Sequence, residues 1–507
     1  MSLNIYAISF DKKNMRFSFS VTLCLFAQLF YAQINSERTH LAIDELTSFI
    51  SIPNFGLNEE DIIKNIRWLE TAFDKRGFTT QRLKTTGNPL LLAERQKDPS
   101  LPTILFYMHL DGQAVDPGKW DQKDPYHAVI KQQNKNGEWE KVDITNQREI
   151  DPESRIFGRS ASDDKGPIIA FLNAIDQTSA NQIKHNIKVI LDGEEEIGSK
   201  PLAAAVVKYR ELLSADALII NDGPVHTSGK PTLTFGCRGI MTLNMTVYGP
   251  IKPQHSGHYG NYAPNPIFNL AELLASMKDE KGRVTIEGYY DGISLDEETK
   301  KILSTVPDDI ETIHGLLQIA EPEEVGKNYQ ESLQYPSLNA RGISSAWIGA
   351  QARTIVPDNA TVALDTRLVT ESDPDHLIQA IRTHIKKQGF HIVDHEPTRE
   401  ERMKYSKLLY FYNSGATLPF RTDMNTPIGN WLEKVVKKTM EEDPVKIRIM
   451  GGTVPIAAFI NELNLPAVIV PMVNPDNNQH SPNENLRIGH FQYAMKMFEG
   501  ILTTEMN

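Results

Sequence analysis

Three apolar runs of this sequence end directly in histidine or carboxylate residues. The first run is followed by His109, the second by Asp192, Gly193 and three glutamates that end at Glu196, and the third by Asn221 and Asp222. Short apolar runs predict buried strands, and open parallel sheets bind ligands just beyond the carboxyl ends of their strands. Imidazole nitrogens and carboxylate oxygens are zinc ligands. The pattern therefore favours a metal site at one edge of a sheet, after the runs at residues 104–108, 187–191 and 217–220.

Two more candidate ligands lie outside these runs. Asp163 comes just before a predicted helix that has Pro167 in its first turn, and His480 lies in a polar loop after the last predicted strand. Two histidines and three carboxylates can hold two metal ions when one carboxylate bridges them, with a water molecule between the ions. This set favours two zinc ions, with manganese or cobalt as alternatives.

Each of these positions also has an ordinary explanation when it is considered alone. His109 and Asp111 can be a surface histidine and a turn aspartate, and an acid before a helix commonly caps that helix. Residues 194–196 can form a solvated acidic turn, Asp222 can belong to a simple turn, and a single loop histidine usually has no special role. The joint occurrence of the five ligands is what predicts a metal centre.

Composition limits the kinds of protein that this chain can be. Its 507 residues predict two domains or more, and its formal net charge of -12 argues against a general nucleic-acid binder. The only two cysteines are Cys24 and Cys237, which excludes a thiolate zinc site and a disulfide framework. Any metal ion must therefore be held by histidine and carboxylate side chains.

The N-terminal segment has the pattern of a secretory signal peptide. Basic residues between positions 12 and 16 precede an apolar run at 21–30, which is shorter than the roughly 20 residues of a membrane-spanning helix. We expect cleavage after Ala32, which removes residues 1–32, and export to the periplasm or the cell exterior; a buried strand or helix is the alternative. We expect no membrane span after the signal peptide is removed.

The elements that must position the candidate ligands alternate between helical and strand-like segments. Apolar strands between amphipathic helices predict an α/β catalytic domain, with a mostly parallel sheet and helices on both faces. Half-buried strand patterns and a long charged stretch then predict an inserted α+β domain that acts as a lid or dimerisation domain. We expect a first catalytic part at 36–233, the inserted domain at 234–400, and a second catalytic part at 401–507.

Seven short segments follow one another in an order that is specific when it is taken as a whole. Together they resemble the metallopeptidase superfamily that includes carnosinases, non-specific dipeptidases, aminoacylases and succinyl-diaminopimelate desuccinylase. Two further stretches, at 286–291 and 335–343, resemble the dipeptidase branch more than the acylase branch. The seven segments are His109–Asp111, Trp120 with Asp124–Tyr126, Gly158–Gly166, Glu195–Ser199, His255–Gly257, Gly451–Ile456 and His480–Glu484.

The resemblance implies a role for each candidate ligand and for two of its neighbours. Asp163 would bridge the two metal ions, with His109 and Glu196 on one side and Asp222 and His480 on the other. Glu195 would be the general base that takes a proton from the bridging water, and Asp111 would hold the ring of His109 from behind.

The resemblance also implies four substrate-binding residues. Arg367 would hold the terminal carboxylate of the substrate, since a guanidinium binds a carboxylate through two parallel hydrogen bonds. His255 would stabilise the developing charge on the carbonyl oxygen and would come from the partner subunit of a homodimer. Thr453 and the backbone of Gly452 would assist.

These observations predict a zinc-dependent metallopeptidase of the dipeptidase or carboxypeptidase type. Its substrates would be dipeptides or short peptides with a free C-terminal carboxylate, and we expect no nucleic-acid partner. The alternative is an N-acyl-amino-acid amidohydrolase of the aminoacylase or desuccinylase type that uses the same metals. A binding protein without catalysis is disfavoured because every ligand and the base are present.

Overall fold

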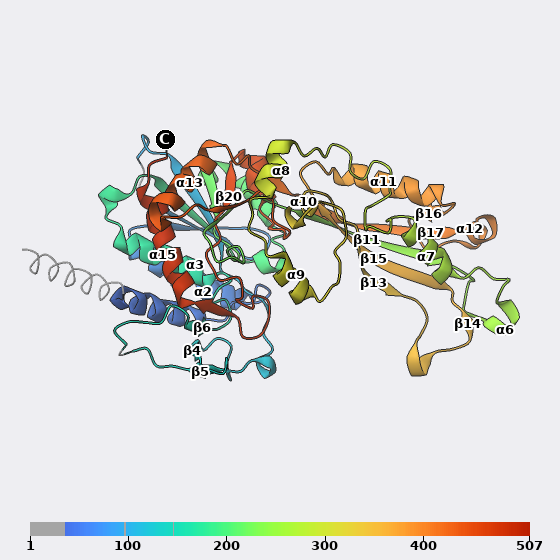
Figure 1. Ribbon diagram of the computed structural model, residues 1–507, viewed down its shortest axis with the longest axis horizontal. Coiled ribbons are helices and arrows are strands. Elements are labelled where there is room, and N and C mark those ends of the chain that lie inside the picture. The colour runs from blue at the N-terminus through green and yellow to red at the C-terminus, as the bar shows by residue number, and fades with distance from the viewer. Residues whose placement is uncertain (1–35, 96–97, 146, 507) are drawn as a thin grey trace, which may run out of the picture.

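The computed structural model describes residues 36–95, 98–145 and 147–506 of the chain. The predicted signal peptide at 1–32 lies outside the described residues. Figure 1 shows two parts side by side: a larger part that contains both the early and the late segments of the chain, and an elongated part built from its middle segments. Among the described residues, no helix is both long enough and apolar enough to span a bilayer.

An eight-stranded sheet forms the centre of the larger part. Its inner strands β7, β3, β8 and β20 are parallel to one another, and antiparallel pairs occur toward both edges. The predicted α/β fold with a mostly parallel sheet is confirmed. In spatial order the strands are β1 (Thr79–Leu83), β2 (Leu90–Arg95), β7 (Asn186–Asp192), β3 (Thr103–His109), β8 (Ala217–Ile220), β20 (Ala467–Ile469), β9 (Thr232–Thr234) and β19 (Val445–Ile447).

Helices cover both faces of this sheet, which is why its inner strands are continuous apolar runs. Along β3, Phe106 packs in the core on one face, whereas Tyr107 packs in the core on the other. The first core contains residues of the helix at 36–50 and of α2 (Glu59–Asp74), α3 (Lys165–Gln177), α13 (Pro427–Met440) and α15 (Ile488–Thr503). The second core contains residues of α4 (Leu202–Lys208), α5 (Arg210–Leu213) and α14 (Ala457–Leu463).

A smaller four-stranded sheet joins two loops that are far apart in the sequence. Its order is β21-β6-β4-β5, with β21 (Asn485–Arg487), β6 (Arg155–Phe157), β4 (Val129–Gln133) and β5 (Trp139–Lys141). Asn485 of β21 lies opposite Phe157 of β6 in the antiparallel register. The loop before β21 and the loop after β6 therefore lie side by side, and these loops carry His480 and Asp163.

The elongated part is built on a five-stranded sheet with helices on one face. Alternate residues of β11 and β15 are buried, as the half-buried strand pattern in the sequence predicts. Its order is β13 (Asn339–Ser344), β15 (Asn359–Leu368), β11 (Gly239–Tyr248), β17 (Leu408–Thr417) and β16 (His391–Val393). A separate core packs this sheet against α7 (Pro266–Ala275) and α11 (Pro374–Lys387).

The elongated part extends beyond residue 400, where the inserted domain was predicted to end. Strand β17 pairs with β11 along most of its length although it lies beyond residue 400. We therefore propose that the inserted domain continues to about residue 417, where β17 ends.

The remaining elements are short and lie around these sheets. Figure 1 shows α8, α9 and α10 between the two parts, and α6 with β14 at the end of the elongated part farthest from the central sheet. These elements are β10 (Gly236–Cys237), β12 (Gln254–His255), α6 (Ser256–Tyr259), α8 (Glu297–Leu303), α9 (Ile310–Leu317), α10 (Tyr329–Ser332), β14 (Ile355–Val356), α12 (Arg399–Lys404) and β18 (Phe420–Arg421).

Candidate active site

The ends of three parallel strands bring the first candidate ligands to one edge of the central sheet. His109 is the last residue of β3 and lies opposite Asp192, the last residue of β7. A short 3-10 turn, η3 (Glu195–Ile197), follows β7, and Asp222 follows the end of β8. The sheet register therefore places these side chains together, as the polar ends of the apolar runs predict.

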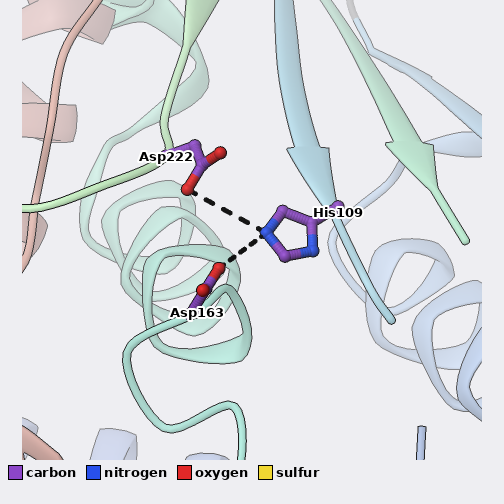
Figure 2. Close-up of side chains that lie close together, drawn as sticks. All are labelled: His109, Asp163 and Asp222. Carbon is purple, nitrogen blue, oxygen red and sulfur yellow. Dashed lines mark hydrogen bonds and ion pairs between the residues drawn. The ribbon is translucent and has the colours of Figure 1, made fainter. Parts of the chain in front are cut away.

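Asp163 completes the first group of potential metal ligands. Figure 2 shows His109, Asp163 and Asp222 with their polar atoms facing one another. Nε2 of His109 lies 2.8 Å from Oδ1 of Asp163 and 4.0 Å from Oδ1 of Asp222. Atoms of these three residues are close enough to ligate a single metal ion.

A second group of potential ligands lies on the other side of Asp163. Nε2 of His480 lies 3.1 Å from Oδ2 of Asp163 and 3.1 Å from Oε2 of Glu196. Asp163 thus belongs to both groups, with one carboxylate oxygen facing each. The expected grouping of His109 with Glu196 and of Asp222 with His480 is wrong, because the structure groups His109 with Asp222 and Glu196 with His480.

The charges in this cluster suit two divalent cations. Oδ2 of Asp163 is buried and has no hydrogen-bond partner within the described ranges, although it faces His480. Burial and the charge of Asp163 raise the pKa of Asp222 to about 6, and the nearby carboxylates of Asp163 and Glu196 raise the pKa of His480 to about 10. Carboxylates held this close repel one another unless cations lie among them, so the donor set fits metal ions.

Asp111 connects the end of β3 to the η3 turn. Oδ1 of Asp111 lies 3.5 Å from Nδ1 of His109, on the opposite side of the ring from Nε2, the nitrogen that faces Asp163. The carboxylate also accepts hydrogen bonds from the backbone N–H groups of Glu195 and Glu196, each at 3.1 Å. Burial raises the pKa of Asp111 to about 6. One side chain therefore orients a ligand of the first group and the backbone of a ligand of the second.

Glu195 is the sequence neighbour of Glu196 and belongs to neither ligand group. Its pKa is raised well above the usual range, because burial disfavours the charged form and the carboxylates of Asp222 and Asp163 add to this effect, while His109 opposes it. A carboxyl group with a raised pKa beside a group of candidate metal ligands is suited to accept and return a proton.

Two residues hold the candidate ligands from behind, and neither was predicted from the sequence. Glu484, fully buried, accepts a hydrogen bond from Arg159 at 2.7 Å and from the backbone N–H of Asp163 at 3.0 Å. Gln113 donates to Oε2 of Glu196 at 2.8 Å. The only signal for Glu484 is its place in the segment that contains His480, and Gln113 gives no signal beyond its nearness to His109.

Three of the four predicted substrate residues lie close together. Nη1 of Arg367 donates to Oγ1 of Thr453 at 2.7 Å, and Oγ1 of Thr453 donates to the carbonyl of Arg238 at 2.6 Å. The backbone N–H of Arg238 donates in turn to the carbonyl of Gly452 at 3.1 Å. Arg238, which was not predicted, therefore connects this group.

His255 does not join the other site residues within one chain. It belongs to β12, which pairs with β14, and its side chain is exposed. Figure 1 places β14 at the far end of the elongated part, away from the central sheet whose strand ends carry the ligand cluster.

The fold and the ligand cluster define a metallopeptidase with an inserted domain, and the comparisons with known proteins agree. The family model described as "Peptidase family M20/M25/M40" matches residues 105–504. The chain belongs to this peptidase family. The resemblance predicted from the seven short segments is therefore confirmed.

Individual relatives place the chain near the dipeptidase branch. The Beta-Ala-His dipeptidase of Mus musculus is 28% identical over 421 residues, which cover 81% of this chain and 78% of that protein. The Cys-Gly metallodipeptidase of Saccharomyces cerevisiae is 25% identical over 482 residues, which cover 90% of this chain and 94% of that protein.

Solved structures share the same fold. The M20 family metallo-carboxypeptidase Sso-CP2 from Sulfolobus solfataricus matches with a TM-score of 0.72 and 28% identity, covering 91% of this chain and 98% of that chain. Human carnosine dipeptidase 1 matches with a TM-score of 0.71 and 23% identity, covering 94% and 98% of the two chains, and this likeness concerns the fold alone.

Proposed function

We propose that this protein is a dinuclear metallodipeptidase that hydrolyses dipeptides or short peptides with a free C-terminal carboxylate. The observation that carries the proposal is the position of Asp163, whose two carboxylate oxygens face two different ligand groups. A bridging carboxylate of this kind is what a two-metal hydrolase requires. The names of the relatives, Beta-Ala-His dipeptidase and Cys-Gly metallodipeptidase, support dipeptides as the substrate class.

The donor set indicates which residues would hold the metal ions. Asp163 would be shared, with His109 and Asp222 completing one site and Glu196 and His480 the other. Imidazole and carboxylate donors favour zinc, with manganese or cobalt as alternatives. When bound, the ions supply Lewis acidity, which lowers the pKa of a water molecule and polarises the scissile carbonyl.

Glu195 would move the proton of the reaction. As a carboxylate it takes a proton from the attacking water, and the neighbouring Asp111 fixes its position through the backbone N–H of Glu195. After the amide bond breaks, the same carboxyl group returns the proton to the leaving amine. The raised pKa of Glu195 suits it to this second step, because it holds the proton until the amine can take it.

Arg367 would bind the terminal carboxylate of the substrate, with Thr453 and the backbone of Gly452 beside it. The hydrogen bond from Arg367 to Thr453 holds the guanidinium in one orientation, which reduces the entropy lost when a carboxylate binds. A dipeptide carries such a carboxylate one residue away from its scissile bond, so this group would favour short substrates over long ones.

His255 would reach the metal cluster of a second copy of the chain in a homodimer. Its exposed position, far from its own cluster, supports this arrangement. Exposed apolar side chains also lie on the edge strand β13, the loop that follows it, and α7, and their burial in an interface would favour association. They are Ile267, Phe268, Ile343, Trp347 and Ile348.

We also propose that the protein is exported. The support for this proposal is the sequence pattern alone: basic residues between positions 12 and 16, followed by the apolar run at 21–30. N-terminal sequencing of the protein purified from its native cells tests it, since export predicts a mature chain that begins near residue 33.

A substrate panel with metal analysis tests the proposed activity. We expect about two zinc, manganese or cobalt ions per chain, and rapid hydrolysis of dipeptides with a free carboxylate. Dipeptide amides, which lack that carboxylate, should be poor substrates. If only N-acyl amino acids are hydrolysed, the protein is an amidohydrolase of the aminoacylase or desuccinylase type and the proposed substrate class is wrong.

A further inference from the structure

A cavity that is separate from the candidate metal ligands adjoins the predicted substrate residues. It has a volume of about 480 Å³, within the range of cavities that hold small organic ligands. Arg238 connects the two places: it lines this cavity, with its Nη2 on the carbonyl of the lining residue Tyr335, and its backbone carbonyl accepts the hydrogen bond from Thr453. None of the predicted metal ligands lines the cavity.

The Arg238 side chain is an incompletely satisfied cation in the wall of this cavity. It is only 7% exposed, and it donates from Nη2 to the carbonyl of Tyr335 at 2.8 Å. Its Nε is buried and has no hydrogen-bond partner in the part of the chain that the structure describes. Burial, aided by the nearby charge of Arg367, lowers the pKa of Arg238 to about 10, so the group is still cationic at neutral pH. A buried guanidinium is best satisfied by a carboxylate, which accepts two parallel hydrogen bonds.

The other walls of the cavity carry a carboxylate and an apolar surface, which could bind an ammonium group and an apolar side chain. Glu323 lines the cavity, and its Oε1 accepts a hydrogen bond from Lys278 at 2.7 Å. A carboxylate has further acceptor capacity on both oxygens, so Glu323 can also accept from an ammonium group. Val284, Val325 and Leu338 add an apolar surface between these polar groups.

We propose that this cavity binds a free amino acid with an apolar side chain, with its carboxylate on Arg238 and its ammonium on Glu323. The cavity offers a cation, a carboxylate and an apolar wall, which are the three features that recognise such a molecule. A peptide amide or an N-acylated amino acid lacks one of the two charges and fits less well. The binding site itself is independent of the proposed peptidase activity.

Contacts through the cavity wall connect this site to Arg367. Ser337 lines the cavity, and its backbone N–H donates to the carbonyl of Arg367 at 3.1 Å. Its Oγ accepts from the backbone N–H of Arg367, also at 3.1 Å. A ligand that reorients Arg238 or Ser337 therefore acts on the group that would hold the substrate carboxylate. This regulatory part of the inference rests on the proposed function: the amino acid that the enzyme releases would bind in the cavity and regulate the enzyme.

Isothermal titration of the metal-loaded enzyme with L-leucine tests the binding site. The variant Glu323→Gln removes the charge that would hold the ammonium, and Glu324→Gln is its matched control. Glu324 is the adjacent residue, it pairs with Lys281 at 2.9 Å, and it does not line the cavity. We expect leucine to bind at a second site in the wild type and in Glu324→Gln, and its affinity for that site to fall about tenfold or more in Glu323→Gln.

Inhibition kinetics separate this site from product binding at the metal cluster. Leucine bound at the cluster competes with the peptide, whereas leucine bound in the cavity also changes kcat. We therefore expect mixed inhibition in the wild type and purely competitive inhibition in Glu323→Gln. Identical titrations and identical inhibition patterns in the wild type and Glu323→Gln would overturn the proposal. Leucine binding that depends on Glu323 in a protein that hydrolyses no peptide would keep the cavity site and refute the proposed function instead.

Discussion

Glu484 and Arg159 form a buried ion pair, with Nη1 of the arginine 2.7 Å from Oε2 of the glutamate. The arginine side chain is 3% exposed and the glutamate side chain is 0% exposed. The same carboxylate accepts hydrogen bonds from the backbone N–H groups of Ser160, Ser162 and Asp163. One buried side chain of the late part of the chain therefore sets the conformation of the loop that presents Asp163 to both ligand groups.

The first prediction is that Glu484→Gln destabilises the protein and weakens metal binding together. The variant leaves Arg159 buried without its counter-charge, which costs about 3–5 kcal/mol in comparable buried pairs. Chemical denaturation and metal titration measure the two effects. Glu153→Gln is the control, because Glu153 pairs with Arg487 at the surface and should contribute only about 0–1 kcal/mol. Equal stability of the two variants would contradict this role of Glu484.

The second prediction concerns Gln113, which donates to Oε2 of Glu196 at 2.8 Å. Residues that orient a ligand typically contribute 10–100-fold to metal affinity or activity, so Gln113→Leu should weaken the binding of one of two ions by about that factor. Competition with a chelator measures this loss, and Gln81→Leu on the exposed face of β1 is the control. A variant that binds both ions as tightly as the wild type would show that this hydrogen bond does not position Glu196.

The sequence is sufficient to predict the part of the site that depends on the central sheet. Strands β3, β7 and β8 are largely buried on both faces, so they are mostly apolar, and the polar residues that follow them must lie at the same edge. His109, Glu196 and Asp222 could be identified for this reason. The elements themselves were recognisable because burial on both faces leaves a strong pattern in the sequence.

The remaining parts of the site depend on pairing that leaves no such pattern. Asp163 meets His480 because β6 pairs with β21, which lies more than 300 residues further along the chain. The grouping of the ligands follows from that pairing and was predicted incorrectly. Glu484 and Arg238 act through hydrogen bonds to backbone groups, and a single sequence does not indicate where such bonds go.

The third prediction is that Glu195→Gln retains both metal ions and loses most of its turnover. Glutamine cannot take a proton from water, and general-base catalysis commonly contributes about 10²–10⁴-fold to the rate. The neighbouring variant Glu194→Gln is the matched control. The Glu194 carboxylate accepts from the backbone N–H of Asn88 at 2.6 Å and belongs to neither ligand group. Metal content and kcat are measured on both. Turnover near the wild-type level in Glu195→Gln would exclude Glu195 as the base.

The fourth prediction is a loss of stability in mild acid that depends on His490. Burial, with the charge of Arg487 as a further cause, lowers the pKa of His490 to about 4 in the folded protein, whereas in the unfolded chain it is near 6.5. As the pH falls, the unfolded state therefore binds a proton on His490 before the folded state does. The free energy of unfolding is unaffected by this residue above pH 6.5 and decreases as the pH falls toward 4. His490→Gln should remove about 3 kcal/mol of this dependence at pH 4. Denaturation midpoints between pH 4 and 7 measure it, and parallel curves for the wild type and the variant would contradict it.

The fifth prediction is that two inactive variants restore activity when they are mixed, if His255 acts on the cluster of a partner chain. His255→Ala and Glu195→Gln should each be nearly inactive as homodimers. A mixed dimer has one site with a native Glu195 facing a native His255, and one site that lacks both. Because equal mixing makes about half of the dimers mixed, roughly a quarter of the wild-type activity should return after subunit exchange. Mixing Glu195→Gln with Asp111→Ala is the control, because Glu195 and Asp111 belong to the same chain's share of each site. Every site of such a mixed dimer therefore lacks one of these two residues, and no activity should return. Recovery in the control as well as in the test mixture, or in neither, would contradict a site that is shared between subunits.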